Sequence, residues 1–337
     1  MHVHEKRIMG LPMRAMALIA GGLLGAAALV VPDAPRAQDR EPGVMQRPRE
    51  PAVAQEAGHD PEAWRRWRGV LFRVQPPGGH GDDTVSFLFG TLHFGSAAEL
   101  GLDTDVVFEA LGHMRRLVNE VDNQAPWDPD MDRYRLLPGK DGLRALIGAP
   151  AFGALAQLLP DVSPAWLSRL KPWAALALLE ARGETAGDQL LDLQLERRAA
   201  AAGLAVEHLE TLREQLAALD CVPAVEHAPV LEQRLRTPWL FAEDSARTLE
   251  YYRTRDLAGW MDDVDAMEGL DARGRAAEQQ ARRCLIEDRN ARWLPRLDAL
   301  LRRGGVFVAV GAIHLTGAAG LLEQLRRRGF SIVAEPL

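Results

Sequence analysis

The sequence predicts an α/β protein in which both ends of the chain build one central mixed sheet, with a large helical insertion between them. Two observations predict this fold class. Short apolar runs with the spacing of strands lie near both ends of the folded part, whereas the middle carries Ala, Leu and charged residues at helical spacing. The middle contains no linker that would separate two domains, so we expect the sheet and the insertion to form one domain.

The predicted strands and helices follow in order along the chain. Two short strands at 70–74 and 85–89 flank a turn rich in Pro, Gly and Asp. After them we expect a helix at 104–114, a strand at 116–121, mostly helix over 142–202 with breaks at Pro160, Pro164 and Pro172, a strand at 204–208, a helix at 210–218 and a helical block over 246–301. The chain closes with a strand, a helix and a strand at 306–310, 318–328 and 330–334, which fits a right-handed βαβ crossover.

Residues 1–37 have the pattern of a secretory signal peptide. Three basic residues precede an uncharged run rich in Ala, Leu, Gly and Val at 15–31. Prolines at 32 and 35 end this run, and Ala37 supplies the small residue expected before a cleavage site. An uncleaved membrane anchor is the alternative, because the apolar run is near the short limit for spanning a bilayer. We expect cleavage, because Pro and Ala follow the run, and a periplasmic location. No Cys for lipid attachment lies near the boundary and no second apolar run approaches transmembrane length, so we expect no membrane attachment of the mature protein.

A disordered linker is predicted at 38–60, where Pro, Glu, Arg and Gln dominate and bulky apolar residues are almost absent. Such a segment buries too little apolar surface to offset the entropy that it would lose on ordering. The folded domain is therefore expected at 61–337, with its first packed residue near Trp64 or Trp67.

Charge and cysteine content limit the classes of partner and chemistry. The 337 residues carry a formal net charge of −7 and no basic stripe, which speaks against a nucleic-acid partner. Cys221 and Cys284 do not form a Cys-x-x-Cys pair, so metal or redox chemistry of these thiols is not expected. In an oxidising compartment they either form a disulfide or remain two separate thiols, and their spacing leaves both alternatives open.

Two copies of a Gly-x-x-His motif lie more than two hundred residues apart in matching contexts. FLFGTLHFG carries Gly90 and His93, and VAVGAIHLTG carries Gly311 and His314, each after an apolar strand and before another glycine. Glycine at a strand end lets the backbone turn or approach a neighbour closely, so the histidine three residues later projects beyond the sheet. Ligands of open α/β sheets bind beyond the carboxyl ends of the strands, where these histidines would lie. The paired motifs therefore favour one shared site of metal ligands or general bases over two structural histidines.

A carboxylate at the end of the strand RLVNEV is a third candidate. Glu120 would lie beside an apolar strand end, where an unpaired charge is costly, so we expect it to be paired or to ligate a metal. Asp122 has the same alternation along the strand and is an alternative for this role.

These motifs stand together with three others in a recognisable order. LKPW lies at 170–173, HLET at 208–211 and DRNARW at 288–293, and the chain closes on FVAVGAIHLTGAAGLLEQLRRRGF. With the two histidine motifs, this order resembles the TraB/GumN family, part of the superfamily that contains the Tiki Wnt-cleaving proteases and the erythromycin esterases. The resemblance runs from about Trp64 to Leu337, and the terminal motif is its most specific part.

The resemblance implies a site built from both motif histidines, a glutamate after an early strand and an arginine. On this chain they correspond to His93, His314, Glu120 and Arg289. Arg282, Arg283 and Arg292 belong to the same predicted helix, so the identity of the arginine stays open. The reaction stays open as well, because relatives in the superfamily include metal-dependent peptidases, a metal-independent esterase and haem-binding lipoproteins.

The leading functional hypothesis is a hydrolase that activates water for attack on a peptide, an ester or another small substrate. In the metal form, which we expect, His93, Glu120 and His314 hold a divalent ion (zinc, manganese or cobalt) and Arg289 stabilises the oxyanion. In a metal-free form, one histidine is the general base and Glu120 orients it or shares its proton. The alternatives are an exported protein that binds haem, a metal or another ligand without chemistry, and a regulatory protein that binds a partner.

Overall fold

The computed structural model describes residues 62–79, 81–122, 124–139, 142–181 and 191–337. The predicted signal peptide at 1–37 and the predicted linker at 38–60 lie outside these residues. Among the helices of the described ranges, none is long and apolar enough to cross a membrane.

The described residues form a six-stranded mixed sheet in the order β4-β3-β5-β2-β1-β6. Its strands are β1 (Leu71–Gln75), β2 (Ser86–Thr91), β3 (Arg116–Asn119), β4 (Ala205–His208), β5 (Val306–Gly311) and β6 (Ser331–Ala334). β4, β3, β5 and β2 are parallel to one another, whereas β1 is antiparallel to both of its neighbours, β2 and β6. Each predicted strand is present with its ends within two residues of the prediction, and the two ends of the chain supply all of these strands except β4. The predicted fold class is confirmed.

The centre of the sheet is formed by β2 and β5, whose residues are all buried. Parallel strands that are covered on both faces have nearly continuous apolar sequences, which is the pattern of FLFG and VFVAVG. Phe89 and Phe307 pack across this pair with ring centroids 6.0 Å apart. The edge strands β4 and β6 are short and more exposed, which limits the open edge that the sheet presents to other chains.

Two helices connect the middle and the end of the chain to this sheet. α6 (Leu191–Ala201) contacts β3, β4 and α1 (Thr104–Gly112), and Glu196 on α6 accepts a hydrogen bond from the Asn119 side chain at the end of β3. α13 (Leu321–Arg327) contacts β6. The predicted closing strand, helix and strand are therefore present, but β6 pairs with β1, so that β2 and β1 lie between β5 and β6.

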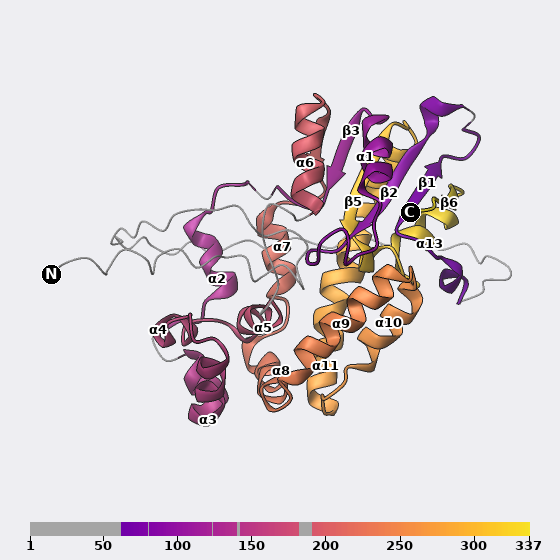
Figure 1. Ribbon diagram of the computed structural model, residues 1–337. Helices are drawn as coiled ribbons and strands as arrows, with labels where there is room; N and C mark the ends of the chain where they lie inside the picture. The colour runs from indigo at the N-terminus through magenta and orange to yellow at the C-terminus, as the bar shows by residue number, and fades with distance from the viewer. Residues whose placement is uncertain (1–61, 80, 123, 140–141, 182–190) are drawn as a thin grey trace, which may run out of the picture.

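The predicted helical insertion lies beside the sheet (Figure 1). Its helices are α2 (Asp132–Arg135), α3 (Gly142–Leu158), α4 (Pro164–Leu167), α5 (Pro172–Glu180), α7 (Leu212–Leu219), α8 (Ala224–Arg236), α9 (Trp239–Arg253), α10 (Leu257–Ala266) and α11 (Ala272–Arg282). α11 continues through a π-helical turn at Arg283–Glu287 into α12 (Asp288–Leu301). Pro164 and Pro172 occupy the first turns of α4 and α5, where the missing N–H of proline costs nothing, so these predicted breaks mark helix starts.

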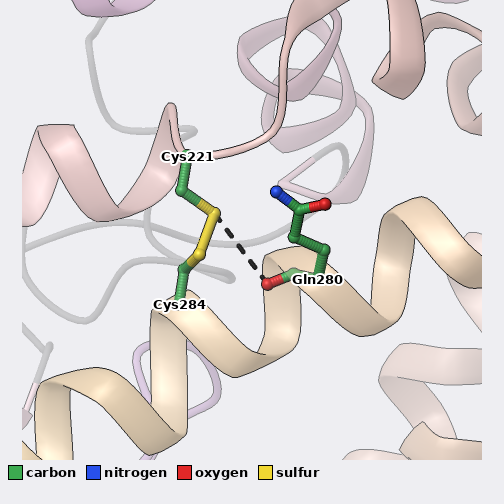
Figure 2. Close-up of a disulfide and its surroundings, with 3 residues drawn as sticks. All are labelled: Cys221, Gln280 and Cys284. Carbon is green, nitrogen blue, oxygen red and sulfur yellow. Dashed lines mark hydrogen bonds between the residues drawn. A yellow bond between two sulfur atoms is a disulfide. The ribbon is translucent and has the colours of Figure 1, made fainter.

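Cys221 and Cys284 form a disulfide, the first of the two alternatives that their spacing left open. The two Cα atoms are 6.5 Å apart, and the bond joins residues 63 positions apart in sequence. Cys221 lies between α7 and α8, and Cys284 lies in the π-helical turn (Figure 2). The disulfide therefore links two parts of the helical insertion.

Two apolar cores meet just beyond the carboxyl end of β5. One core consists of the sheet with residues of α1, α6, α12 and α13, and the other consists mainly of residues of α3, α5, α7, α8 and α11. Ile313, two residues after β5, packs against both cores. The segment after β5 therefore lies at the junction of the sheet and the insertion.

Candidate active site

Each of the four parallel strands is followed by one ionisable side chain at the same edge of the sheet. His93 follows β2, Glu120 follows β3, Glu210 follows β4 and His314 follows β5, each within three residues of the strand end. Parallel pairing puts the carboxyl ends of these strands at one edge. Because ligands of open α/β sheets bind at this edge, it is the candidate active site.

Three of these side chains surround Gly311. A Cβ atom on Gly311 would lie 3.4 Å from Glu120 Oε1, 3.4 Å from His93 Nε2 and 3.5 Å from His314 Cδ2. The amide of Gly311 donates a hydrogen bond of 2.7 Å to Glu120 Oε1. The φ of −51° at Gly311 is available to any residue, so this glycine matters because it leaves space at the centre of the site. The structure thus brings His93, Glu120 and His314 together.

Arg289 joins this group from α12 and is 1% exposed. Its Nη2 donates to Glu120 Oε2 and, at 2.7 Å, to Glu210 Oε1, and its Nε donates to Glu210 Oε1 at 3.0 Å. Its Nη1 donates to the Leu285 carbonyl at 3.3 Å and to His314 Nε2 at 3.2 Å. All five N–H donors of the guanidinium are therefore used within the protein. Burial would lower the pKa of Arg289, but Glu120 and Glu210 raise it above its ordinary value, so the group is a permanent cation.

The other arginines of this helix lie outside the site. The side chain of Arg292 is 45% exposed and reaches only Glu210, at 3.5 Å. Arg282 pairs with acidic side chains of α10 and of the π-helical turn, and Arg283 is exposed. Position therefore identifies Arg289 as the arginine of the site.

His314 is held in one orientation. The partners of its ring nitrogens assign one tautomer, in which Nδ1–H donates to Asn290 Oδ1 at 2.8 Å and Nε2 accepts the N–H of Arg289. The ring also packs against Trp293, with centroids 4.7 Å apart. Burial, the larger cause, and the charge of Arg289 lower the pKa of His314 to about 3, although Glu120 opposes them. His314 is therefore neutral at neutral pH.

His93 forms a pair with Asp192, the second residue of α6. His93 Nδ1 lies 2.9 Å from Asp192 Oδ2, and the two side chains are 12% and 15% exposed. With Nδ1–H donated to the carboxylate, Nε2 faces the space beside Gly311 and makes no hydrogen bond to a described residue. Burial lowers the pKa of His93, but Asp192 and then Glu120 outweigh burial and raise it above its ordinary value. Of the four predicted site residues, His93 is the one most open to solvent.

Glu120 is the buried anion of the site and is 5% exposed. Burial raises the pKa of Glu120, but Arg289, and after it His314 and His93, lower this pKa to about 2. The carboxylate is therefore ionised at neutral pH. Asp122, the alternative carboxylate, instead accepts a hydrogen bond of 2.8 Å from the Gln124 amide in the following turn.

A family model with the description TraB/PrgY/gumN family matches residues 79–334, which is most of the chain. The chain belongs to this family. The match confirms the resemblance that the motifs predicted, and it includes His93, Glu120, Arg289 and His314. No match to the chain is found among curated proteins.

In this TraB/PrgY/gumN family protein, four further side chains complete the site: Asp192, Glu210, Asn290 and Trp293. Glu210 accepts a hydrogen bond of 3.2 Å from Trp293 Nε1 in addition to those from Arg289. Glu210 belongs to HLET, and Asn290 and Trp293 belong to DRNARW, so the motifs carried a signal for these three. Asp192 had no such signal, because it is one charged residue in a charged helix and meets His93 only through the docking of α6 on the sheet.

The predicted metal ligands do not fit a divalent ion as they are arranged. Within the ranges that the structure describes, no group of three or more His, Cys, Asp or Glu side chains could hold a metal ion. His314 Nε2 and Glu120 Oε2 both accept N–H groups of Arg289, and Glu120 Oε1 accepts the Gly311 amide. A second cation at these atoms would be repelled by the guanidinium. The metal-binding roles of His93, Glu120 and His314 stay predictions.

Proposed function

We propose that this TraB/PrgY/gumN family protein is a hydrolase in which His93, oriented by Asp192, activates water for attack on a peptide or ester carbonyl. The observation that carries the proposal is the His93–Asp192 pair at the most accessible corner of an otherwise buried site. In such a pair the carboxylate fixes Nδ1–H, which makes Nε2 the basic atom.

His93 has the properties of a general base, whereas His314 lacks them. Among the residues that the structure describes, none forms a hydrogen bond with His93 Nε2, and a pKa above the ordinary value increases the affinity of the ring for a proton. His314 Nε2 already accepts from Arg289, and burial with this cation lowers the pKa of His314 to about 3. A general base works best when its pKa is near the pH of the reaction. These differences support His93 as the base and His314 as a fixed neutral neighbour.

The proposed proton path runs through the His93 ring. Nε2 takes a proton from water as the water oxygen attacks the carbonyl carbon, and the proton then passes to the leaving amine or alcohol. The imidazolium formed in between lies beside the carboxylates of Asp192 and Glu120, which stabilise its charge. The buried anion Glu120 therefore contributes without contacting the substrate.

Arg289 acts in this proposal by positioning Glu120. Stabilisation of an oxyanion, the role that the resemblance implies for the arginine, would require Arg289 to release one of its five internal hydrogen bonds. Its bonds to Glu120 and Glu210 instead keep the Glu120 carboxylate ionised beside His93.

A metal-bound hydrolase with a zinc, manganese or cobalt ion is the competing version of this proposal. It requires Arg289 to leave Glu120 and His314, so that their lone pairs become free for the ion. Export to the periplasm belongs to both versions. The pattern of residues 1–37 and the Cys221–Cys284 disulfide, a bond typical of oxidising compartments, support it.

A panel of peptide and ester substrates, assayed with and without a chelator, tests the proposal. We expect hydrolysis that resists the chelator and falls by about 10²-fold or more in His93→Asn, since general-base catalysis contributes about that factor. His113→Asn is the matched control, because the His113 side chain, directly after α1, is 72% exposed and should be dispensable.

Three results would contradict parts of the proposal. Loss of activity with the chelator and recovery with one added metal would favour the metal form. Full activity of His93→Asn would remove His93 as the base. Absence of hydrolysis, together with a haem absorption band that is lost in the His93→Ala, His314→Ala double variant, would favour a ligand-binding protein.

A further inference from the structure

We propose that α7 is a brace, meaning that its two ends are attached to one continuous helix, at Cys284 in the π-helical turn and at Arg289 in α12. We propose further that the disulfide at one end makes the position of Arg289 depend on redox conditions. The effect on activity rests on the proposed function, whereas the effect on the position of Arg289 does not.

The first end of the brace holds Arg289 directly. Glu210 lies two residues before α7, is 7% exposed, and accepts hydrogen bonds from Arg289 and from Trp293 Nε1. The next residue, Thr211, caps α7 in a capping box with Glu214. Because the cap fixes the chain at the helix start, a movement of α7 is passed to the Glu210 carboxylate.

The second end of the brace is held by the disulfide and by an ion pair. Cys221 follows α7 by two residues and is bonded to Cys284 (Figure 2). Asp220, between α7 and Cys221, accepts hydrogen bonds from Lys171 Nζ at 2.5 Å and from Trp173 Nε1 at 3.3 Å. The LKPW motif thus contacts the end of α7, and the HLET motif forms its start.

Both ends meet the same continuous helix. Cys284 lies in the π-helical turn, and Arg289 lies five residues later in α12. α7 is therefore attached to this helix by the disulfide before Arg289 and by Glu210 at Arg289 itself. A π-helical turn is rare and occurs mostly as a single turn within an α-helix, commonly at functional sites. Loss of the disulfide would leave this turn free to rearrange and to shift Arg289 relative to Glu120 and His314.

Reduction is chemically open to this bond. Neither cysteine is fully buried, and the proposal requires that a small dithiol reaches one of the two sulfur atoms. One thiolate of the dithiol attacks a sulfur of the pair, breaks the Sγ–Sγ bond, forms a mixed disulfide with one cysteine and releases the other as a thiol. The second thiol of the reagent then attacks the mixed disulfide and releases the remaining cysteine. Two electrons and two protons pass from the dithiol, which becomes a disulfide. In the disulfide form, Cys221 Sγ lies 3.9 Å from the Gln280 carbonyl, which is a nearby acceptor for the S–H that reduction creates (Figure 2).

The indole N–H signal of Trp293 in a ¹H–¹⁵N spectrum reports the state of the brace without any assay of activity. Trp293 Nε1 donates to Glu210, and the Arg289 Cζ lies 4.6 Å from the centre of its ring, so both groups affect this signal. Trp293→Phe assigns it among the eight tryptophans. The probe is dithiothreitol, with reduction measured by thiol alkylation and mass spectrometry. We expect the Trp293 signal to shift in step with reduction, while the signal of Trp239, which is 57% exposed, stays in place.

Two variants separate a brace from general loss of stability. The Cys221→Ser, Cys284→Ser double variant should show the shifted Trp293 signal without dithiothreitol and no response to it. Val74→Ala creates a cavity beside β1, away from α7. If it lowers the melting temperature as much as the double variant does, it should still leave the Trp293 signal unchanged. If the protein hydrolyses a substrate, reduction should lower kcat at least about tenfold with little change in KM, as expected for misplaced catalytic groups.

Two outcomes would overturn the proposal. One is an unmoved Trp293 signal in protein whose two thiols are both alkylated. The other is collapse of all indole signals together on reduction, because the disulfide would then stabilise the whole fold rather than one site. If no form of the protein hydrolyses any substrate, the proposed function fails, and the Trp293 signal still decides whether α7 is a redox-dependent brace.

Discussion

Arg289 is the residue on which the charges of the site depend. It is buried between Glu120 and Glu210, and every N–H of its guanidinium has an acceptor. Buried ion pairs of this kind contribute little net stability when complete, but removal of one partner leaves an uncompensated charge in a poorly solvated position. Loss of Arg289 should therefore lower the stability of the fold strongly, whereas loss of its exposed neighbours should change it little.

Arg289→Met should destabilise the protein by about 3–5 kcal/mol, because two carboxylates would remain buried without their cation. Arg292→Met, on the same helix and also beside Glu210, should change the free energy of unfolding by only about 0–1 kcal/mol, since its side chain is 45% exposed. Urea unfolding of the two variants measures the difference. Equal stability of both would show that the buried network is not as described.

Asp192→Asn should keep a hydrogen-bond acceptor for His93 but remove the charge that raises the pKa of its ring. We expect the pKa of His93 to fall, the acid limb of the pH profile of kcat/KM to move to lower pH, and kcat to drop by about 10²-fold. Asp122→Asn is the control, because the Asp122 side chain accepts from the Gln124 amide in the following turn and forms no hydrogen bond to His93. An unchanged pH profile in Asp192→Asn would separate Asp192 from the reaction.

At the scale of the elements, the two Gly-x-x-His motifs use their first glycines differently. A Cβ on Gly90 would lie 2.8 Å from Ala312 Cβ and 2.9 Å from Leu315 Cδ1, so Gly90 permits β2 to pack against the segment after β5. Gly311 instead leaves space between the site side chains. Their second glycines, Gly95 and Gly317, have φ values of 84° and 89°, a conformation that favours glycine in the turn after each histidine.

Gly90→Ala and Gly311→Ala should therefore have opposite effects. Gly90→Ala should destabilise the protein by about 1–3 kcal/mol through overpacking against Ala312. Gly311→Ala should fold with a melting temperature near that of the wild type, but lose most activity because its methyl group fills the space beside His93 Nε2. Calorimetry and the hydrolysis assay together check both. Full activity of Gly311→Ala would mean that water and substrate do not use this space.

At the scale of the whole molecule, the buried site makes folding dependent on pH. The pKa of His314 is about 3 in the folded protein, and the pKa of an unfolded histidine is about 6.5. Below pH 6.5 the unfolded chain therefore binds a proton that the folded protein does not bind until about pH 3, so stability falls with falling pH in this window. The lowered pKa of Glu120, about 2, acts in the same direction below the ordinary value of 4.5.

His314→Gln should lose less stability than the wild type between pH 6.5 and pH 4, because glutamine takes up no proton in either state. Urea unfolding across this range measures the two slopes. His113→Gln, which removes an exposed histidine, should retain the slope of the wild type. Equal slopes for His314→Gln and the wild type would show that His314 is not held neutral in the folded protein.

The sequence by itself predicted the strands, and it named four residues that the structure brings together at the candidate site. Short continuous apolar runs ended by glycine are local properties, and the strands that carry the histidine motifs follow from them, as does the fold class. The HLET and DRNARW motifs contain the other residues around Arg289, namely Glu210, Asn290 and Trp293. α8 was not anticipated, because Pro229 interrupts its helical pattern and no local feature offsets the proline.

Only the tertiary structure decided how these residues act on one another. Asp192 meets His93 because α6 docks on the sheet, and the choice of Arg289 over Arg292 depends on which face of α12 is buried. The engagement of Glu120 and His314 by the guanidinium also depends on how α12 packs beside the sheet. Local sequence records the conformation of a segment, whereas the partner of a buried charge is set by strand register and helix packing over many residues, where burial decides which charges must meet.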